Sequence, residues 1–514
     1  MSTIILAELD GWHGASGAVR TVRLCTAAWR DWTDPTPWWP LLLPAGGWTL
    51  AATAPGEVDG STRVEVGELQ LDERPPANDP FGTPRLTELL DGMRLVGWPV
   101  RLYAVQPGRP LSERVPLGRL TVGEVERRRY ARVLRPRDRA ADLDVRAAGP
   151  GAYAGTGGAE GEAALKDKGK ELLIGRVRHF EPTYLGMDGG AHLYSATGGR
   201  PMGGYVEVRS RGRRIAAEVT TTPAAGQWRQ DAATGRLWVG PGDVGTVTCA
   251  ARGVTVGGVV AETAGAVATF LATTASGALS AAEVDAVAAA SLDAGGRKLA
   301  RWFPAGDGAT LRAVLDEIGR SVRADWFMTP GGILTFARRG RPPAGAVPTA
   351  TLRAGVDFVQ AVTRDRVDGI PPRRARLRYA QNGRTLGGND LVEDVPAAEK
   401  SAITTEWLET VSPEDPATVA ACPIDREETI ETLLSDAAEA AAEALARRDE
   451  GVDAPDLYDL PMRRLPTERV GQLVRILDPG HPVFAGAGRV ARIVEVAVDL
   501  AGIDHRVTAL PEAG

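Results

Sequence analysis

Residues that could carry out hydrolysis are few and scattered along this chain. A glycosidase needs two carboxylates roughly 5–10 Å apart across a cleft, and Glu181 and Asp188 are a pair that adjoining strands could bring face to face. Any chain rich in acidic residues offers such pairs by chance. There is no G-x-S-x-G nucleophile motif, and the sequence signals no cysteine–histidine pair. We therefore expect a protein that is not an enzyme.

The histidines and cysteines form no metal-binding pattern. The histidines are His13, His179, His192, His481 and His505, and the cysteines are Cys25, Cys249 and Cys422. None lies in an H-E-x-x-H or C-x-x-C spacing. His179 and His192 lie on either side of Asp188 in the sequence. Because none of the three is part of a ligand motif, we interpret them as a chance polar cluster and not as a metal site. Isolated cysteines are typical of a protein assembled in a reducing cytoplasm, and we expect no bound metal.

A lysine cluster around Gly169 is similar to a phosphate-binding loop. Its members are Lys166, Lys168 and Lys170. The G-x-x-x-x-G-K pattern, however, needs a glycine at position 164, which is Ala164, and Glu171 stands where the pattern has Ser or Thr. The cluster is therefore interpreted as a solvated edge of a linker, and no cofactor is expected.

A tryptophan-rich stretch near the amino terminus is the candidate binding feature. Its members are Trp29, Trp32, Trp38, Trp39 and Trp48, interleaved with Pro35, Pro37, Pro40 and Pro44. Tryptophan is enriched at interface hot spots and on sugar-binding platforms, and proline holds a loop extended without donating a hydrogen bond. We expect a contact with a subunit or a neighbouring protein. A packed internal loop and a glycan platform are the alternatives.

Composition narrows the class of protein. A length of 514 residues predicts about three or four domains, and 43% hydrophobic with 25% charged residues is typical of globular proteins. A net charge of −6 argues against a nucleic-acid-binding protein. The first ten residues lack the basic region of a signal peptide. No segment reaches the roughly 20 apolar residues of a membrane span.

Hydrophobic periodicity predicts a mainly β chain with helices confined to a few segments. Strands are expected at Ser2–Asp10, Ala18–Thr26, Arg63–Leu71 and Gly488–Leu500. Helices are expected at Glu262–Ala275, Ser280–Ser291, Thr310–Val322 and Arg426–Arg448. A hairpin of Ala324–Met328 and Ile333–Arg338 is expected to follow the third helix.

The same pattern divides the chain into modules. Residues 1–148 are expected to form a β module, 149–161 a glycine-rich linker, and 162–255 a small β domain. Residues 256–345 are expected to form an α+β domain, and 346–514 a second β module with one long helix.

The order of these features resembles a family of bacteriophage tail-tip proteins related to central baseplate hubs. The resemblance rests on Lys168–Val177 followed by Phe180-Glu181-Pro182, on Ala233–Leu237, on the hairpin Ala324–Phe327 with Gly332–Phe336, and on the terminal β segment. It implies two tail-tube-like β-barrel modules flanking smaller β and α+β domains, trimeric assembly, and no catalytic residues. Met1–Trp48, with its tryptophans, matches no feature of the family.

The resulting hypothesis is a structural protein of the virion tail tip, assembled in the host cytoplasm. A homotrimeric hub ring would close the tail tube, contact the distal tail ring and tube above, and meet tip or fibre proteins below. DNA would pass through without specific binding. A receptor- or glycan-binding tail protein is the runner-up, and a tail-associated wall hydrolase is the third alternative.

Overall fold

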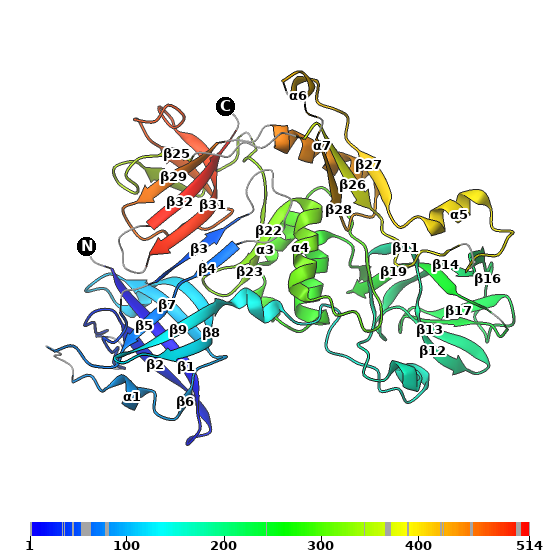
Figure 1. Cartoon of the computed structure of the whole chain (residues 1–514), viewed down its shortest axis with the longest axis horizontal. Helices are drawn as coiled ribbons and strands as arrows, with labels where there is room; N and C mark the ends of the chain where they lie inside the picture. Colours follow the sequence, from blue (N-terminus) through cyan, green and yellow to red (C-terminus); the bar gives the residue numbers. More distant parts are fainter. Residues whose placement is uncertain are drawn as a thin grey trace.

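The computed structural model describes residues 3–512 except 33, 35, 44–45, 53–62, 78–81, 243, 344, 365–371, 388–389, 422–423, 425, 453–455 and 500–504. Pro35, Pro44 and Cys422 therefore lie outside the described residues. Two curled half-barrel sheets, built from the two ends of the chain, lie next to each other, with helices beside them and a small β unit on the far side (Figure 1). The expected fold class, mainly β and multidomain with α+β insertions, is confirmed.

The first half-barrel is built from antiparallel strands. They run in the order β2-β1-β7-β8-β9-β5, with β6 paired to β1. The strands are β1 (Ile4–His13), β2 (Ala18–Cys25), β5 (Leu69–Asp72), β6 (Met93–Arg94), β7 (Pro99–Val105), β8 (Val115–Arg127) and β9 (Ala131–Asp138). The helical elements described here are short: α1 (Leu86–Leu89) and 3₁₀ turns at Leu111–Glu113 and Arg139–Leu143.

The second half-barrel follows the order β24-β30-β31-β32-β29-β25 and contains one parallel pair, β24 with β30. Its strands are β24 (Ala350–Arg353), β25 (Val362–Arg364), β29 (Leu457–Met462), β30 (Leu473–Leu477), β31 (Arg489–Asp499) and β32 (His505–Pro511). A further hairpin, β3 (Gly47–Ala51) with β4 (Arg63–Val66), is added to β31. This hairpin comes from the amino-terminal part of the chain.

The prediction of one continuous strand at Arg63–Leu71 is wrong, because the segment forms two strands that belong to different half-barrels. Its first part is β4 in the second sheet, and its last part is β5 in the first. The division falls at Gly67, whose N–H donates to the Gly47 carbonyl at 2.6 Å. A Cβ at Gly67 would lie 2.8 Å from the Gly47 nitrogen. Only glycine allows the two backbones this approach, so the chain can leave one sheet and enter the other here.

The hydrophobic core follows this exchange of strands. One continuous buried cluster includes Leu9 and Leu102 of the first half-barrel, Leu50 of β3, and Ile476 and Val496 of the second. The two sheets therefore share one core, although they are built from opposite ends of the chain.

The small β unit consists of two sheets packed around Phe180, Tyr205 and Trp228. One sheet holds β11 (Arg176–Phe180), β14 (Met202–Ser210), β15 (Arg213–Arg214), β19 (Val247–Val256) and β20 (Val259–Val260). The other holds β12 (Thr183–Asp188), β13 (Ala191–Ser195), β16 (Ala217–Glu218), β17 (Gln227–Asp231) and β18 (Arg236–Val239). The glycine-rich segment 149–161 packs onto this unit through buried Tyr153, whose hydroxyl donates to Glu171 at 2.5 Å.

The helical unit holds α2 (Ala264–Phe270), α3 (Ala286–Leu292), α4 (Leu311–Val322) and the hairpin of β22 (Ala324–Met328) with β23 (Leu334–Arg338). Helix α4 and the hairpin agree with the sequence prediction. The Thr310 side chain caps α4 by accepting from the Ala313 N–H. The helix expected at Ser280–Ser291 is interrupted. Its Ser280–Glu283 capping box surrounds a 3₁₀ turn, and Val284 is extended because it bridges to Leu334.

The long helix expected at Arg426–Arg448 is corrected. Its first part is strand β28 (Glu427–Glu431), which pairs in parallel with β26 (Arg374–Tyr379), and helix α7 runs from Ala437 to Val452. β27 (Leu408–Val411) completes this three-stranded sheet. Successive side chains of a strand point to opposite faces of the sheet, and this segment suits that pattern. Ile430 is buried towards α7, while Glu427 and Glu431 pair with arginines of β26 on the exposed face.

A buried carboxylate attaches α7 to the helical unit. The Glu443 side chain is fully buried and lies 2.6 Å from an Arg297 nitrogen and 3.0 Å from nitrogens of both Arg323 and Arg447. Arg323 follows the end of α4 with a φ of 50°, in the left-handed region. One carboxylate therefore holds three guanidinium groups from three segments.

Glu443→Gln should destabilise the chain by about 3–5 kcal/mol, because it leaves buried guanidinium groups without their countercharge. Urea denaturation followed by circular dichroism measures the change. Asp449→Asn on the same helix is the control, since the Asp449 side chain is 53% exposed and its ion pair with Arg448 should contribute under about 1 kcal/mol. Equal effects of the two substitutions would contradict the role given to Glu443.

A second ionic contact joins the first half-barrel to the helical unit. Arg139, which is largely buried, donates to the Gly332 carbonyl and to the Glu283 carboxylate. The Ser280 N–H also donates to Glu283 at 3.0 Å. The backbone bond from Ser280, followed by Arg139, lowers the pKa of Glu283 from 4.5 to about 2.

A carboxyl group whose pKa is lower in the folded chain than in the unfolded chain stabilises the fold. This stabilisation is complete above the pKa of the unfolded chain and is lost as the pH falls through the pKa of the folded chain. The stability advantage of the natural chain over Glu283→Gln should therefore be constant above pH 4.5 and shrink between pH 4.5 and about 2. Its size is on the order of 2 kcal/mol. Chemical denaturation at pH 6 and pH 2.5 measures it. A difference that does not change with pH would show that the charge of Glu283 is not what stabilises this contact.

Candidate functional site

The tryptophan-rich stretch joins the two edges of the first half-barrel. We call the described part of residues 29–43 the bridging segment. The backbone N–H of Trp39 donates to the Arg23 carbonyl at 3.0 Å, and the Trp39 carbonyl accepts from the Cys25 N–H at 2.8 Å. Arg23 and Cys25 both lie on edge strand β2. Leu41 accepts from Asp72 of edge strand β5 at 2.8 Å. Backbone groups at both edges of the sheet are thus satisfied within the chain.

Trp29 and Trp38 of the bridging segment are buried against the outer face of the sheet. Their rings meet edge to face, with centroids 5.9 Å apart. They form a separate hydrophobic cluster with Ile4, Leu6 and Cys25. Strand β1 is therefore apolar on both faces at its start, with Ile5 and Ala7 in the main core and Ile4 and Leu6 under the tryptophans.

The tryptophans differ in what they offer to a partner. Trp29 and Trp38 are 5% and 2% exposed, and Trp39 and Trp48 pack partly buried against the main core. Trp32 is 67% exposed. Of the five tryptophans expected at a protein contact, Trp32 is therefore the one whose side chain the fold leaves largely exposed. Sequence alone could not separate them, since burial depends on Ile4 and Leu6 of a distant strand.

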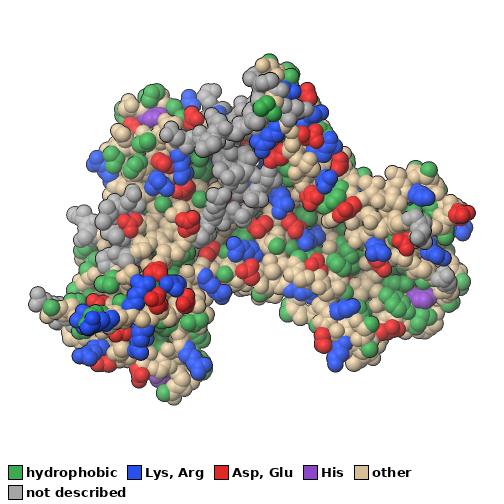
Figure 2. All heavy atoms as spheres, in the orientation of Figure 1, with side chains coloured by type: hydrophobic (Ala, Val, Ile, Leu, Met, Phe, Trp, Pro, Cys, Tyr) green, Lys and Arg blue, Asp and Glu red, His purple; other side chains and the backbone are tan. Residues whose placement is uncertain are grey.

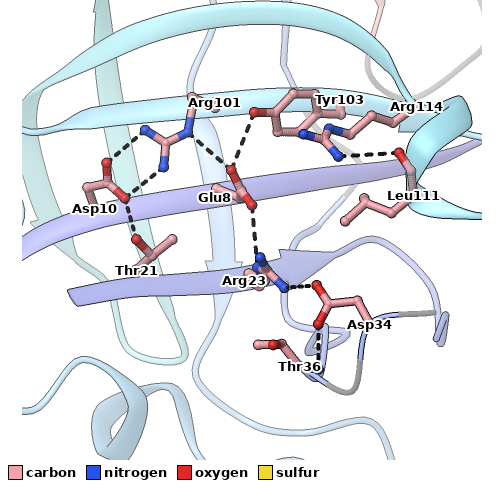
Figure 3. Close-up of polar contacts among 10 residues, drawn as sticks. All are labelled: Glu8, Asp10, Thr21, Arg23, Asp34, Thr36, Arg101, Tyr103, Leu111 and Arg114. Carbon is pink, nitrogen blue, oxygen red and sulfur yellow. Dashed lines mark hydrogen bonds and ion pairs between the residues drawn. The ribbon is translucent and has the colours of Figure 1, made fainter. Parts of the chain in front are cut away.

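An ionic network fixes the bridging segment to the sheet (Figure 3). Glu8 lies 3.1 Å from Arg101 and 3.3 Å from Arg23, and Arg23 reaches Asp34 of the bridging segment at 2.6 Å. Arg101 also donates two bonds of 2.8 Å to Asp10. The Thr36 N–H, followed by Arg23, lowers the pKa of Asp34 from 3.8 to about 2. These charges are paired with one another, so the network holds structure in place.

Further exposed apolar side chains lie on both half-barrels, and the sequence prediction missed them. Trp12 and Val19 are cross-strand partners on the β1–β2 hairpin. Val356 and Val359 lie in the turn where Phe358 bridges both Ala354 and Met462, which joins β24 to β29. Isolated exposed valines are ordinary in a sequence, so no local signal could have identified them.

The hydrolase pair is not brought together. Glu181 precedes β12 and Asp188 ends it, which places them about 20 Å apart along an extended strand. Glu181 pairs with Arg384 at 3.4 Å, and Asp188 accepts from the Trp238 indole at 2.8 Å. The separation exceeds that of glycosidase carboxylates.

The other candidate side chains are also engaged separately. His179 is buried, and burial followed by the charges of Arg209 and Arg178 lowers its pKa from 6.5 to about 4, so it is neutral at pH 7. The Lys170 amine pairs with Glu160 at 2.8 Å. No group of three or more His, Cys, Asp or Glu side chains that could hold a metal occurs in the part of the chain that the structure describes. In the same part, no helix is long and apolar enough to cross a membrane.

Comparison with known proteins gives matches at the level of structure. No family model and no curated protein matches the chain. Among solved structures, it is similar to the 43 kDa tail protein of prophage MuSo2 from Shewanella oneidensis, with 10% identity, a TM-score of 0.36, and coverage of 99% of this chain and 98% of the other. A tail protein from Neisseria meningitidis MC58 gives 10% identity, a TM-score of 0.35, and coverage of 100% and 98%. The prophage tail protein gp18 from Listeria monocytogenes EGD-e gives 7% identity, a TM-score of 0.38, and coverage of 99% and 94%. Since every one of these TM-scores is below 0.5, the function has to be sought in this chain's own geometry.

Proposed function

We propose that this chain is a structural component of a phage tail tip, a baseplate-hub-like protein that assembles as a homotrimeric ring. The ring closes the tail tube, contacts the distal tail ring and tube above, and meets tip or fibre proteins below. Each copy contributes two half-barrels that act as tail-tube-like modules, so three copies supply six modules around the axis. Its place is the virion tail tip, after assembly in the host cytoplasm.

The pairing of β3 with β31 is the observation that carries this proposal. Trp48, Thr49 and Leu50 of the amino-terminal part lie in register with Val498, Ala497 and Val496 of the last half-barrel. Together with the shared core, this pairing fixes the angle between the two modules. A ring built head to tail closes only if the rotation from one module to the next is constant. In a ring of three copies, every second rotation lies within one copy, and a rigid pair of modules keeps that rotation constant.

Exposed apolar side chains on both modules support contacts between copies. Trp12, Val19 and Trp32 lie on the first module, and Val356 and Val359 on the second. A heterologous contact joins two different surfaces, and such surfaces are available on the two modules of one chain.

The distribution of charge supports a channel that DNA passes through without binding. Basic and acidic side chains are interspersed over the face seen in Figure 2, and the chain carries a net charge of −6. A protein that holds nucleic acid presents a basic surface instead.

Native mass spectrometry of the purified chain tests the symmetry. A trimer is expected across a range of protein concentrations. A hexamer would contradict the pairing of two modules per chain with a six-fold ring, and a monomer at every concentration would remove the ring.

Trp32→Ala should weaken trimer formation while the melting temperature of the chain changes by less than about 2 °C, since the side chain is exposed. Trp38→Ala is the matched control from the same segment. Because Trp38 is buried, it should lower the free energy of unfolding by about 3–5 kcal/mol. Analytical ultracentrifugation and thermal denaturation give the two readouts.

Unchanged trimer formation by the Trp32→Ala variant would contradict a role for Trp32 at a subunit contact. A variant that still forms trimers but no longer adsorbs to host cells would favour the receptor- or glycan-binding alternative, in which exposed Trp32 is the contact with sugar.

A further inference from the structure

A polar cavity lies where the small β unit meets the start of helix α7. Its volume is about 350 Å³. It is lined by Arg176, Val260, Arg252, Glu262, Lys298, Ser435 and Asp436. These residues come from β11, β19, β20 and the segments before α2, β21 (Arg301–Phe303) and α7. The cavity is far in sequence from the bridging segment and plays no part in the contacts proposed for the ring.

Two of the lining residues are arginines placed side by side on neighbouring strands. Arg176 of β11 is the direct cross-strand partner of Arg252 of β19, and both side chains are exposed. Like charges directly opposite each other destabilise a sheet. Neither guanidinium makes an ion pair or a hydrogen bond with any residue that the structure describes. The pair therefore lacks a countercharge.

The other charged groups around the cavity already have contacts of their own. The Lys298 amine lies 3.3 Å from the Glu262 carboxylate. Asp436 accepts from the N–H groups of Ala438 and Glu439 at 2.9 and 3.1 Å, at the first turn of α7. The lining keeps a formal excess of one positive charge, and that excess is carried by the two arginines.

We infer that this cavity binds a phosphate group through Arg176 and Arg252. A single guanidinium satisfies a carboxylate with a two-pronged contact, whereas two guanidiniums present enough donors for the three or four oxygens of a phosphate. Free inorganic phosphate and a phosphate ester both carry this group, and the cavity volume of about 350 Å³ is large enough for a small ester.

Isothermal titration calorimetry with inorganic phosphate and, separately, glycerol 3-phosphate tests the inference on the full-length chain. Binding with a Kd in the range of about 0.1–1 mM is expected. The double variant Arg176→Gln/Arg252→Gln should weaken it about tenfold or more. Arg213→Gln is the control. Arg213 is an exposed arginine of β15, in the same sheet as β11 and β19, and it is paired with Asp394, so its replacement should leave binding unchanged. Stronger binding of one ligand than the other identifies the form of phosphate that the cavity prefers.

Two outcomes would overturn the inference. One is the absence of binding by the natural chain at concentrations up to about 10 mM, and the other is binding that the double variant retains in full. Circular dichroism and thermal denaturation of the double variant show whether it is folded. We expect it to be at least as stable as the natural chain, since a like-charge pair is removed. Trimer formation is measured separately, so a failure here leaves the ring untouched.

Discussion

Backbone hydrogen bonding along β31 is the constraint on which the rest of the structure depends. This strand extends over Arg489–Asp499, but its neighbour β30 pairs only with Arg489–Arg492. The remaining part, Glu495–Asp499, would be an unpaired edge beside a hydrophobic core, where unsatisfied N–H and C=O groups are costly. Strand β3 fills that edge from more than 400 positions earlier in the chain. The first module must therefore lie next to the last.

Two segments outside the regular strands also form hydrogen bonds with the free edges of the half-barrels. The bridging segment connects β2 with β5 in the first half-barrel, and the turn around Phe358 connects β24 with β29 in the second. Both segments pack large side chains as they cross, Trp38 in one and Phe358 in the other. Each half-barrel is thus completed within the chain, and the side chains left on the outside, such as Trp32 and Val356, are available to neighbours.

Local signals in the sequence predicted the elements whose causes are local. Helix α4 follows from Thr310 as a cap and from the 3.6-residue spacing of Leu311, Leu315 and Ile318. Distant partners decided the rest. Glu427–Glu431 is a strand because β26 offers both hydrogen bonds and arginines, and nothing nearby in the sequence announces them. In the same way, the tryptophans predicted a packed or binding segment, but only the fold separates buried Trp38 from exposed Trp32.

The two half-barrels form one body because β3 completes the free edge of β31. Native-state hydrogen exchange of the amides of β31 and of the first half-barrel's β1 and β7 measures this directly. If the claim holds, the slowest amides of both half-barrels exchange with the same free energy of opening, since neither module can unfold while the other remains intact. If β1 and β7 open at a markedly lower free energy while β31 stays protected, the modules unfold independently, and the pairing of β3 with β31 does not make them one body.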